Sequence, residues 1–534
     1  KGLVKLLGVG VENNFLQQAS IPSEYVTGGA TVTGYLPGLD RWDPDWYVRD
    51  TKYSFNNDNA AFDLNVVLHP YGEDAPMRVM LYNSDGTLLA FGSTASGEWY
   101  AWEGETWELD YTDLPVGSYF LVVRAGTYYE GDHYWGNPGT YEMVIGSGTN
   151  PYSYHDSVGA KVATYGGVTV DKGVTISRNW FNGNDAHGLE IDSYTPGGNV
   201  LVANSEFFSN NRYGLKLNSW ALGRTVTLNK LYLGDNKDYN VNVNAMGPVS
   251  WTSGDSGTST NGAYINNSNF GPPNTPYAVT ISGVNFHNTQ NNNGLSVSSY
   301  GNVSLTSVGA WENAYHGVSI DNCLYSSGVC PGSGTVTVNN SNGSSFNNNG
   351  YSGLYVNSKG SVTLTNVGAT DNGGLGVDVD NQQSGAGTGA VTLTYTLDRQ
   401  VSNNGDMGIQ VNSNGAITLT SAKHLWVQHN CWSSYCSAGI FLNNGASLTP
   451  ALVKVEGTLS TSINSVDNNG RGLVIGSKGA VTVKNTNVYS NMGYGLQIGD
   501  YSGSKPGSVT LTSVVAQDNG RSGSGVQLRL PHQH

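Results

Sequence analysis

The chain has 534 residues, with 25 Lys and Arg against 40 Asp and Glu, a formal net charge of −15 and a charged fraction of only 12%. The acidic balance excludes nucleic acid as the main partner, because phosphate recognition needs clustered positive charge. The low charge density excludes a coiled coil or a long helical bundle, and no run of about 18 apolar residues is present to span a membrane.

The first 11 residues, KGLVKLLGVGV, are apolar but too short and wrongly flanked for a signal peptide. We interpret residues 1–11 as an N-terminal strand or arm. We expect this strand to add to the open sheet edge of a neighbouring copy.

Residues 12–146 are rich in aromatic side chains and carboxylates, and short alternating runs are separated by turn signals. Asn83-Ser84-Asp85-Gly86 lies between two apolar runs and predicts a hairpin. We therefore expect a small antiparallel β-sandwich here. Residues 147–165 form a Gly/Ser/Tyr-rich linker, and residues 166–534 form a separate domain.

This first domain resembles the bacterial pre-peptidase C-terminal domain, a small β-sandwich of secreted proteins. The resemblance rests on segments that occur in order: Glu12-Asn13-Asn14, Thr31-Val32-Thr33-Gly34, Asp43-Pro44-Asp45-Trp46-Tyr47, Met80 to Leu89, Leu114 to Tyr119 and Gly139-Thr140-Tyr141-Glu142. Some relatives of this domain bind calcium through acids at matching positions. The resemblance therefore implies a possible calcium site at Glu12, Asn14, Asp40 and Asp43, whose hard oxygen ligands suit this ion. Solvated acids and turn caps are the alternative.

Aromatic residues gather between positions 99 and 135 of the same domain. They include Trp99, Trp102, Trp107, Tyr128 and Trp135. Such rings can stack on sugar rings, and we treat them as candidate ligand-binding residues. The alternative is that they form the core or the cross-strand pairs of the sandwich.

The remainder of the chain is repetitive. The whole chain contains 72 glycines and 59 asparagines, and this part is dominated by Asn, Gly, Ser, Thr and Val. About twelve units of mostly 23–36 residues each combine a V-T-L-T-like strand, an Asn/Gly loop and a G-apolar-x-apolar-x strand; the interval 225–278 reads as a long insertion. Because one unit cannot bury its thin apolar face alone, neighbouring units must stack into parallel sheets.

The C-terminal domain resembles a right-handed parallel β-helix of the pectate-lyase-like kind. The resemblance rests on strands such as Gly188–Asp192, Gly353–Asn357 and Gly408–Asn412. We therefore expect an all-β protein, with an antiparallel β-sandwich followed by a β-helix of about twelve coils. The resemblance implies polysaccharide-active enzymes as one possible function.

Enzymes of this fold place reactive side chains on the outward face of one sheet, so candidate residues should occupy equivalent outward positions of neighbouring units. Asp378 and Asp380 share one strand, with Asp321 two coils away. Two carboxylates at glycosidase separation are therefore possible, and these three are the candidate catalytic residues. The alternative is that they cap turns or form ladders.

A second group of charged residues occupies equivalent positions in earlier units. Glu190 and Asp192 share one strand, and Lys216 lies on the next coil. We treat these three as candidate ligand-binding residues, again with a structural ladder as the alternative.

The four cysteines occur as two close pairs, Cys323 with Cys330 and Cys431 with Cys436. Zinc sites usually need four ligands at close spacing, which these pairs lack. Two local disulfides are expected, and they imply an extracellular or cell-surface protein.

Three functions follow from these observations. Uniform, mostly uncharged outward positions favour a structural or adhesive subunit of an extracellular filament, sheath or stalk, assembled from copies of itself head to tail or with other surface proteins. The alternatives are a secreted polysaccharide lyase, hydrolase or epimerase, and a carbohydrate-binding adhesin without catalysis. Calcium is the only cofactor that the sequence suggests.

Overall fold

The structure is a computed structural model that describes residues 4–7, 10–11, 30–36, 50–57, 62–71, 77–94, 107–115, 117–125, 128–130, 133–135, 139–146, 160–164, 166–171, 178–184, 186–194, 197–268, 276–323, 330, 334–382, 389–430, 438–447, 449–458, 463–466, 470–499, 506–520 and 526–528. Every regular element within these ranges is a β-strand. None of the described residues lies in a helix of the length and hydrophobicity that a membrane crossing requires. The chain divides into two compact units, Lys1–Gly247 and Pro248–His534.

The first unit begins with two antiparallel sheets that confirm the expected sandwich. One sheet has the order β4 (Asp50–Asn57), β10 (Gly117–Ala125), β6 (Met77–Asn83), β7 (Leu88–Phe91). The other has the order β3 (Ala30–Leu36), β13 (Gly139–Gly146), β5 (Phe62–Tyr71), β9 (Trp107–Leu114), β8 (Ser93–Thr94), and β11 (Tyr128–Glu130) pairs with β12 (His133–Trp135). Alternate residues such as Leu64, Leu81 and Leu121 are fully buried and form the core.

The rest of the first unit consists of parallel coils. One sheet carries the G-apolar-x-apolar strands and is called the site sheet below. In this unit it contains β14 (Ala160–Thr164), β17 (Leu189–Ser193), β19 (Leu215–Ser219) and β21 (Tyr239–Ala245). The second sheet contains β15 (Val168–Asp171), β16 (Asn179–Phe181), β18 (Val200–Phe208) and β20 (Val226–Gly234).

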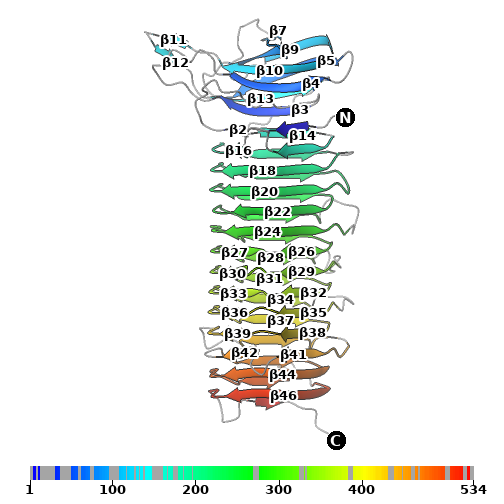
Figure 1. Cartoon of the computed structure of the whole chain (residues 1–534), viewed down its shortest axis with the longest axis vertical. Helices are drawn as coiled ribbons and strands as arrows, with labels where there is room; N and C mark the ends of the chain where they lie inside the picture. Colours follow the sequence, from blue (N-terminus) through cyan, green and yellow to red (C-terminus); the bar gives the residue numbers. More distant parts are fainter. Residues whose placement is uncertain are drawn as a thin grey trace. The chain divides into compact units, whose positions relative to one another are not determined.

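The second unit repeats this arrangement (Figure 1). Its site sheet contains β23 (Gly262–Asn266), β25 (Leu295–Ser298), β28 (Val318–Asp321), β31 (Leu354–Asn357), β34 (Val377–Asn381), β37 (Ile409–Ser413), β40 (Ile440–Asn443), β43 (Leu473–Gly476), β45 (Leu496–Ile498) and β47 (Val526–Leu528). Its second sheet contains β22 (Val249–Ser256), β24 (Val279–His287), β26 (Val303–Thr306), β27 (Gly309–Trp311), β29 (Val336–Asn339), β30 (Ser345–Asn347), β32 (Val362–Thr365), β33 (Gly368–Thr370), β35 (Val391–Tyr395), β36 (Arg399–Ser402), β38 (Ile417–Ser421), β39 (Leu425–Gln428), β41 (Val453–Gly457), β42 (Ile463–Val466), β44 (Ala480–Tyr489) and β46 (Ser508–Gln517).

Each unit contains parallel β-solenoid coils, and the turns number about 11 in all, close to the expected twelve. The interval 225–278 is not an insertion, because Val249–Ser256 forms β22 and Gly262–Asn266 forms β23. The sequence pattern concealed this coil because β23 has Ala263 where most coils have Leu, Val or Ile.

The N-terminal arm pairs with its own chain. Strand β1 (Val4–Leu7) runs parallel to β15, with Val4 opposite Val168, and β2 (Gly10–Val11) pairs with β16. The arm thus covers the edge of the first coil. This corrects the expectation that residues 2–11 reach a neighbouring molecule.

The Asn-Asn-Gly turns connect neighbouring coils. In the turn at residues 348–350, Asn348 has a φ of 57°, which Asn tolerates, whereas Asn349 is buried and is hydrogen-bonded to the next coil. Position 350 requires glycine because the backbone of Ala314 lies close to it, and a Cβ there would be 2.1 Å from the carbonyl oxygen of Ala314. The turn therefore locks successive coils into register.

Candidate functional site

The outward columns of the site sheet have the register that the sequence predicts. Asp378 lies opposite Tyr355 on one side and Gln410 on the other. Asp380 lies opposite Asn357, which in turn lies opposite Asp321. Because the inward residues Val377 and Val379 are fully buried, the polar partners on each strand must point outward. The candidate catalytic residues therefore share one face.

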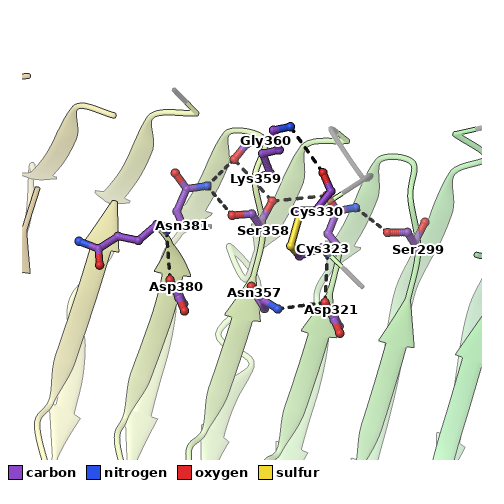
Figure 2. The surroundings of a disulfide bond; sticks show 12 residues. Ser299, Asp321, Cys323, Cys330, Asn357, Ser358, Lys359, Gly360, Asp380 and Asn381 are labelled. Atoms are coloured by element: carbon purple, nitrogen blue, oxygen red, sulfur yellow. Dashed lines mark hydrogen bonds between the residues drawn. A yellow bond between two sulfur atoms is a disulfide. The ribbon is translucent and has the colours of Figure 1, made fainter. Parts of the chain in front are cut away.

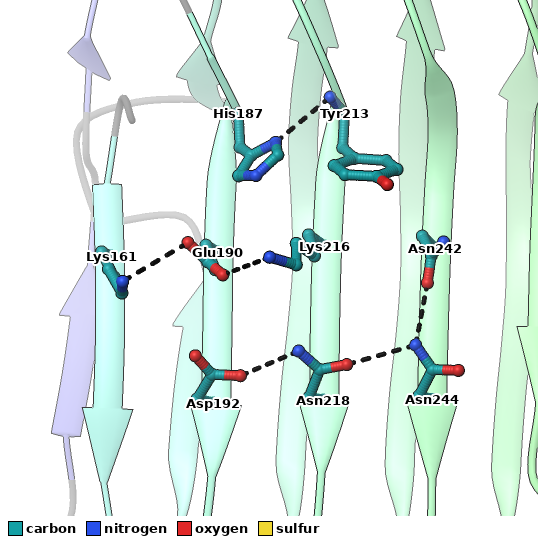
Figure 3. Close-up of polar contacts among 9 residues, drawn as sticks. All are labelled: Lys161, His187, Glu190, Asp192, Tyr213, Lys216, Asn218, Asn242 and Asn244. Atoms are coloured by element: carbon teal, nitrogen blue, oxygen red, sulfur yellow. Dashed lines mark hydrogen bonds and ion pairs between the residues drawn. The ribbon is translucent and has the colours of Figure 1, made fainter. Parts of the chain in front are cut away.

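Glu190, in the first unit, forms ion pairs with two lysines (Figure 3). Lys216 Nζ lies 2.6 Å from Glu190 Oε1, and Lys161 Nζ lies 3.7 Å from Oε2. Burial alone would raise the pKa of Glu190, but the hydrogen bond from Lys216 and the two lysine charges outweigh it and hold the pKa below its usual value. Glu190 is thus an ionised structural partner and not a proton donor near neutral pH.

Asp192 forms the start of an amide ladder in the same unit (Figure 3). Asn218 Nδ2 donates to Asp192 Oδ1 at 2.8 Å, and Asn244 Nδ2 donates to Asn218 Oδ1 at 3.2 Å. Burial raises the pKa of Asp192 despite the hydrogen bond from Asn218. The structure brings Glu190, Asp192 and Lys216 together as predicted, and their bonds are those of a ladder.

Asp321 and Asp380 cap turns, as the alternative reading held (Figure 2). Asp321 Oδ1 accepts the backbone N–H of Cys323 at 3.0 Å, and Asp380 Oδ1 accepts that of Gln382 at 3.0 Å. The Nδ2 of Asn357 also donates to Asp321 Oδ1, at 3.1 Å. One oxygen of each carboxylate is therefore used to fix the end of its strand.

Asp378 has a different environment. Gln410 Nε2 donates to its Oδ1 at 3.1 Å. Burial, with smaller contributions from the charges of Asp380 and Asp406, raises the pKa of Asp378 to about 6, although the hydrogen bond from Gln410 opposes the shift. Asp378 therefore keeps a proton in mildly acidic solution and can donate it.

Four aromatic rings precede Asp378 on the neighbouring coils. The rings of Tyr315 and Tyr351 stack with centroids 6.2 Å apart, and both side chains are more than half exposed, at 53% and 54%. His316 stacks on Tyr355 at 5.2 Å and meets Tyr351 edge-on at 5.2 Å. An exposed aromatic surface thus lies one coil away from an acid that can hold a proton.

His316 belongs to this surface as a neutral ring. Burial lowers its pKa to about 4, although a backbone hydrogen bond with Ser352 opposes the shift. His187 holds the matching position in the first unit, where its Nδ1 faces the backbone N–H of Tyr213 at 3.3 Å. Both histidines therefore join successive coils.

Sequence reasoning missed Tyr315, Tyr351 and Asp406. All three lie two residues before the glycine that opens a G-apolar-x-apolar-x strand, outside the outward positions of the strand itself. An alignment of the residues two before Gly317, Gly353 and Gly408 would have placed them in one column.

The remaining predicted residues have mixed outcomes. Trp107 is a core residue, 1% exposed, and its Nε1 donates to the carbonyl oxygen of Val79 at 3.1 Å, which corrects its assignment as a ligand-binding residue. Tyr128 and Trp135 are backbone partners in the β11–β12 pair. Trp99 and Trp102 lie outside the described residues.

The calcium candidates Glu12, Asn14, Asp40 and Asp43 also lie outside the described residues. In the part of the chain that is described, no group of three or more His, Cys, Asp or Glu side chains is arranged to hold a metal ion.

One expected disulfide is present, between Cys323 and Cys330 (Figure 2). It closes a short loop directly after β28, beside the turn that Asp321 caps. Cys431 and Cys436 lie outside the described residues.

Two kinds of solved structure are similar to the chain. The pre-peptidase C-terminal domain of a collagenase from Bacillus anthracis is 19% identical, with 24% of this chain and 99% of that chain covered and a TM-score of 0.16. The catalytic unit of a thermostable GH87 α-1,3-glucanase from Streptomyces thermodiastaticus is 12% identical, with 93% and 95% covered and a TM-score of 0.25. The catalytic domain of a GH87 α-1,3-glucanase in complex with nigerose is 11% identical, with 95% and 99% covered and a TM-score of 0.19.

No protein-family model and no curated protein matches the chain. The similar structures are of the two kinds that the sequence resembles, a pre-peptidase C-terminal domain and a parallel β-helix.

Proposed function

We propose that this protein is an extracellular carbohydrate-active protein that binds a neutral polysaccharide on the site sheet of residues 248–534 and hydrolyses it with Asp378 as the proton donor. The observation that carries this proposal is the raised pKa of Asp378, about 6, one coil from Tyr355 and the exposed ring of Tyr351.

Aromatic rings and carboxylates suit a sugar for complementary reasons. The faces of Tyr315 and Tyr351 offer flat apolar area to the C–H groups of a pyranose ring. Carboxylates such as Asp406 accept hydrogen bonds from sugar hydroxyls. Saccharides need both kinds of contact, because their rings have apolar faces and polar edges.

A neutral polymer fits this face better than a uronic acid polymer. Asp378, Asp380 and Asp406 lie close enough for the latter two to raise the pKa of the first. The two outward columns from β25 to β40 contain no Lys, Arg or His. In these two columns a uronate would therefore meet like charge and no cation to neutralise it, which disfavours a lyase.

Hydrolysis requires a proton donor and a base on opposite sides of the glycosidic bond. Asp378 gives its proton to the leaving glycosidic oxygen as the bond to the anomeric carbon breaks, while water attacks that carbon and gives a proton to the second carboxylate. Asp380 is two residues along the same strand, a rise of about 6.6 Å. This lies in the range of about 6.5–9.5 Å used by inverting glycosidases, with Asp380 as the base.

The filament expected from the sequence lacks support, because the arm that would bridge two molecules pairs with β15 and β16 of its own chain. The extracellular location is supported by the Cys323–Cys330 disulfide, since such bonds persist in oxidising compartments.

The test is a panel of α-1,3-, α-1,4-, β-1,3- and β-1,4-glucans, with polygalacturonate and alginate included. We expect reducing ends to be released from one neutral polymer by the wild type and not by Asp378→Asn, with binding to that polymer retained by the variant. Binding without cleavage by the wild type would show a non-catalytic adhesin. Absence of both binding and cleavage would contradict the proposal.

A further inference from the structure

Just before the strands of the site sheet, a series of backbone hydrogen bonds joins one residue of each coil to the next, and one residue of this ladder, Gly374, has no side chain. The backbone N–H of Tyr351 donates to the carbonyl oxygen of Tyr315, that of Gly374 to Tyr351, and that of Asp406 to Gly374, at 3.0, 2.9 and 3.0 Å. These four residues therefore occupy the same position on four successive coils. Two tyrosine rings are followed by Gly374 and then by a carboxylate.

Gly374 leaves one face of the Tyr351 ring without a neighbour in this ladder. Tyr315 covers the other face, at 6.2 Å between centroids, and Tyr351 is nevertheless 54% exposed. Tyr351 and Asp406 are two coils apart, or about 9.6 Å by strand spacing. A flat ring in van der Waals contact at about 4 Å from Tyr351 leaves about 5–6 Å to the backbone of Asp406, which the aspartate side chain can bridge.

We infer that one neutral hexopyranose ring of the polysaccharide stacks on Tyr351 at the Gly374 position and donates hydroxyl hydrogen bonds to the carboxylate of Asp406. This inference rests on the proposed function and adds the place and the contacts of one sugar-binding subsite.

The orientation of this sugar follows from the stacked tyrosine rings that it extends. Tyr315 and Tyr351 stack from coil to coil with 25° between their planes, so a sugar stacked on Tyr351 also faces along the direction of coil stacking. Equatorial substituents then leave the ring in its own plane, and one of these directions runs along β34 toward Asp378.

The experiment measures binding in the Asp378→Asn background, where the polymer stays intact. Isothermal titration with oligosaccharides of the bound polymer compares this parent with added Tyr351→Ala, Asp406→Ala or Gly374→Ala. Trp426→Ala is the matched control, because Trp426, like Tyr351, contacts a histidine ring, here His424 with centroids 5.1 Å apart, but lies on the second sheet. Thermal unfolding verifies that each variant is folded. This check matters most for Gly374→Ala, because a Cβ at Gly374 would lie 3.1 Å from the carbonyl carbon of Tyr351 and could strain the backbone.

We expect Tyr351→Ala and Asp406→Ala each to weaken binding about tenfold or more, since each removes a contact worth about 1.4 kcal/mol or more. Gly374→Ala should also weaken binding, and Trp426→Ala should leave it unchanged. If the parent binds but Tyr351→Ala and Asp406→Ala bind equally well, the subsite is refuted while the proposed function stands. If the parent binds no glycan of the panel, both are refuted.

Discussion

The side-chain amide of Asn349 donates a hydrogen bond to Oδ1 of Asn372 at 2.9 Å, and the backbone N–H of Asn349 donates to the same oxygen at 3.1 Å. Asn372 makes the same two bonds to Asn404 in the next coil. Buried asparagines thus tie each coil to its neighbour through both backbone and side chain.

Replacing one of these buried asparagines should lower the free energy of unfolding. Asn372→Ala removes the acceptor of two buried donors on Asn349 and two donors of its own, so we expect a loss of about 2–4 kcal/mol in the free energy of unfolding. Asn348→Gly is the control, because Asn348 is exposed with a φ of 57° that glycine adopts freely. Urea unfolding measures both, and equal stability of the two variants would contradict a structural role for the ladder.

The N-terminal arm should keep the chain monomeric. Deletion of residues 1–11 removes β1 and β2 and exposes the edge of β15, which β1 covers. Because an open parallel edge is a template for strand pairing, the shortened protein should associate in a concentration-dependent way. Sedimentation velocity of the full chain and the deletion variant measures this. A shortened chain that stays monomeric at high concentration would show that the arm does not protect this edge.

The raised pKa of Asp378 predicts a pH-dependent stability. Its folded pKa of about 6 exceeds the reference value of 3.8, so the stability that its proton provides is complete below about pH 3.8 and is lost as pH rises through 6. Asp378→Asn lacks this titration and should gain up to about 3 kcal/mol relative to the wild type between pH 4 and pH 7.

Urea unfolding of wild type and variant at several pH values tests this prediction. Asp518→Asn, which changes an exposed carboxyl on the last described coil, is the control and should follow the wild type. A constant difference between Asp378→Asn and the wild type across this pH range would mean that Asp378 does not hold its proton.

The Cys323–Cys330 disulfide should stabilise its own coil. It joins residues seven apart, and a loop of this size is expected to contribute about 2.5 kcal/mol through restriction of the unfolded chain. In the double variant Cys323→Ser/Cys330→Ser, hydrogen exchange should quicken in β28 and β31 and stay unchanged in β14, because stability in a solenoid is local. Unchanged exchange in β28 would show that the bond does not stabilise this coil.

Most of the fold could be predicted from the sequence because its signals are local. Alternation of buried and outward residues, as in Val377–Asn381, identifies strands and the sheet face that each side chain joins. The repeat glycine sets the register between coils, so Asp378 could be placed beside Tyr355 and Gln410. The coil that contains β23 was missed because Ala263 weakens the apolar pattern.

The candidate site could be predicted only in part. Asp378 was identified as an outward carboxylate, but its raised pKa depends on burial by neighbouring coils, which a single strand does not encode. Tyr351 and Asp406 lie in turns, and their alignment depends on coils of unequal length. Asn349 and Asn372, for example, are 23 residues apart, whereas Asn372 and Asn404 are 32 apart.

The most direct test of the account is a crystal structure of the Asp378→Asn variant with an oligosaccharide of the polymer that it binds. The account predicts a sugar ring over Gly374, stacked on Tyr351 and hydrogen-bonded to Asp406, with a glycosidic oxygen beside residue 378. A sugar bound only on the second sheet near Trp426, or only on the N-terminal sandwich, would contradict it.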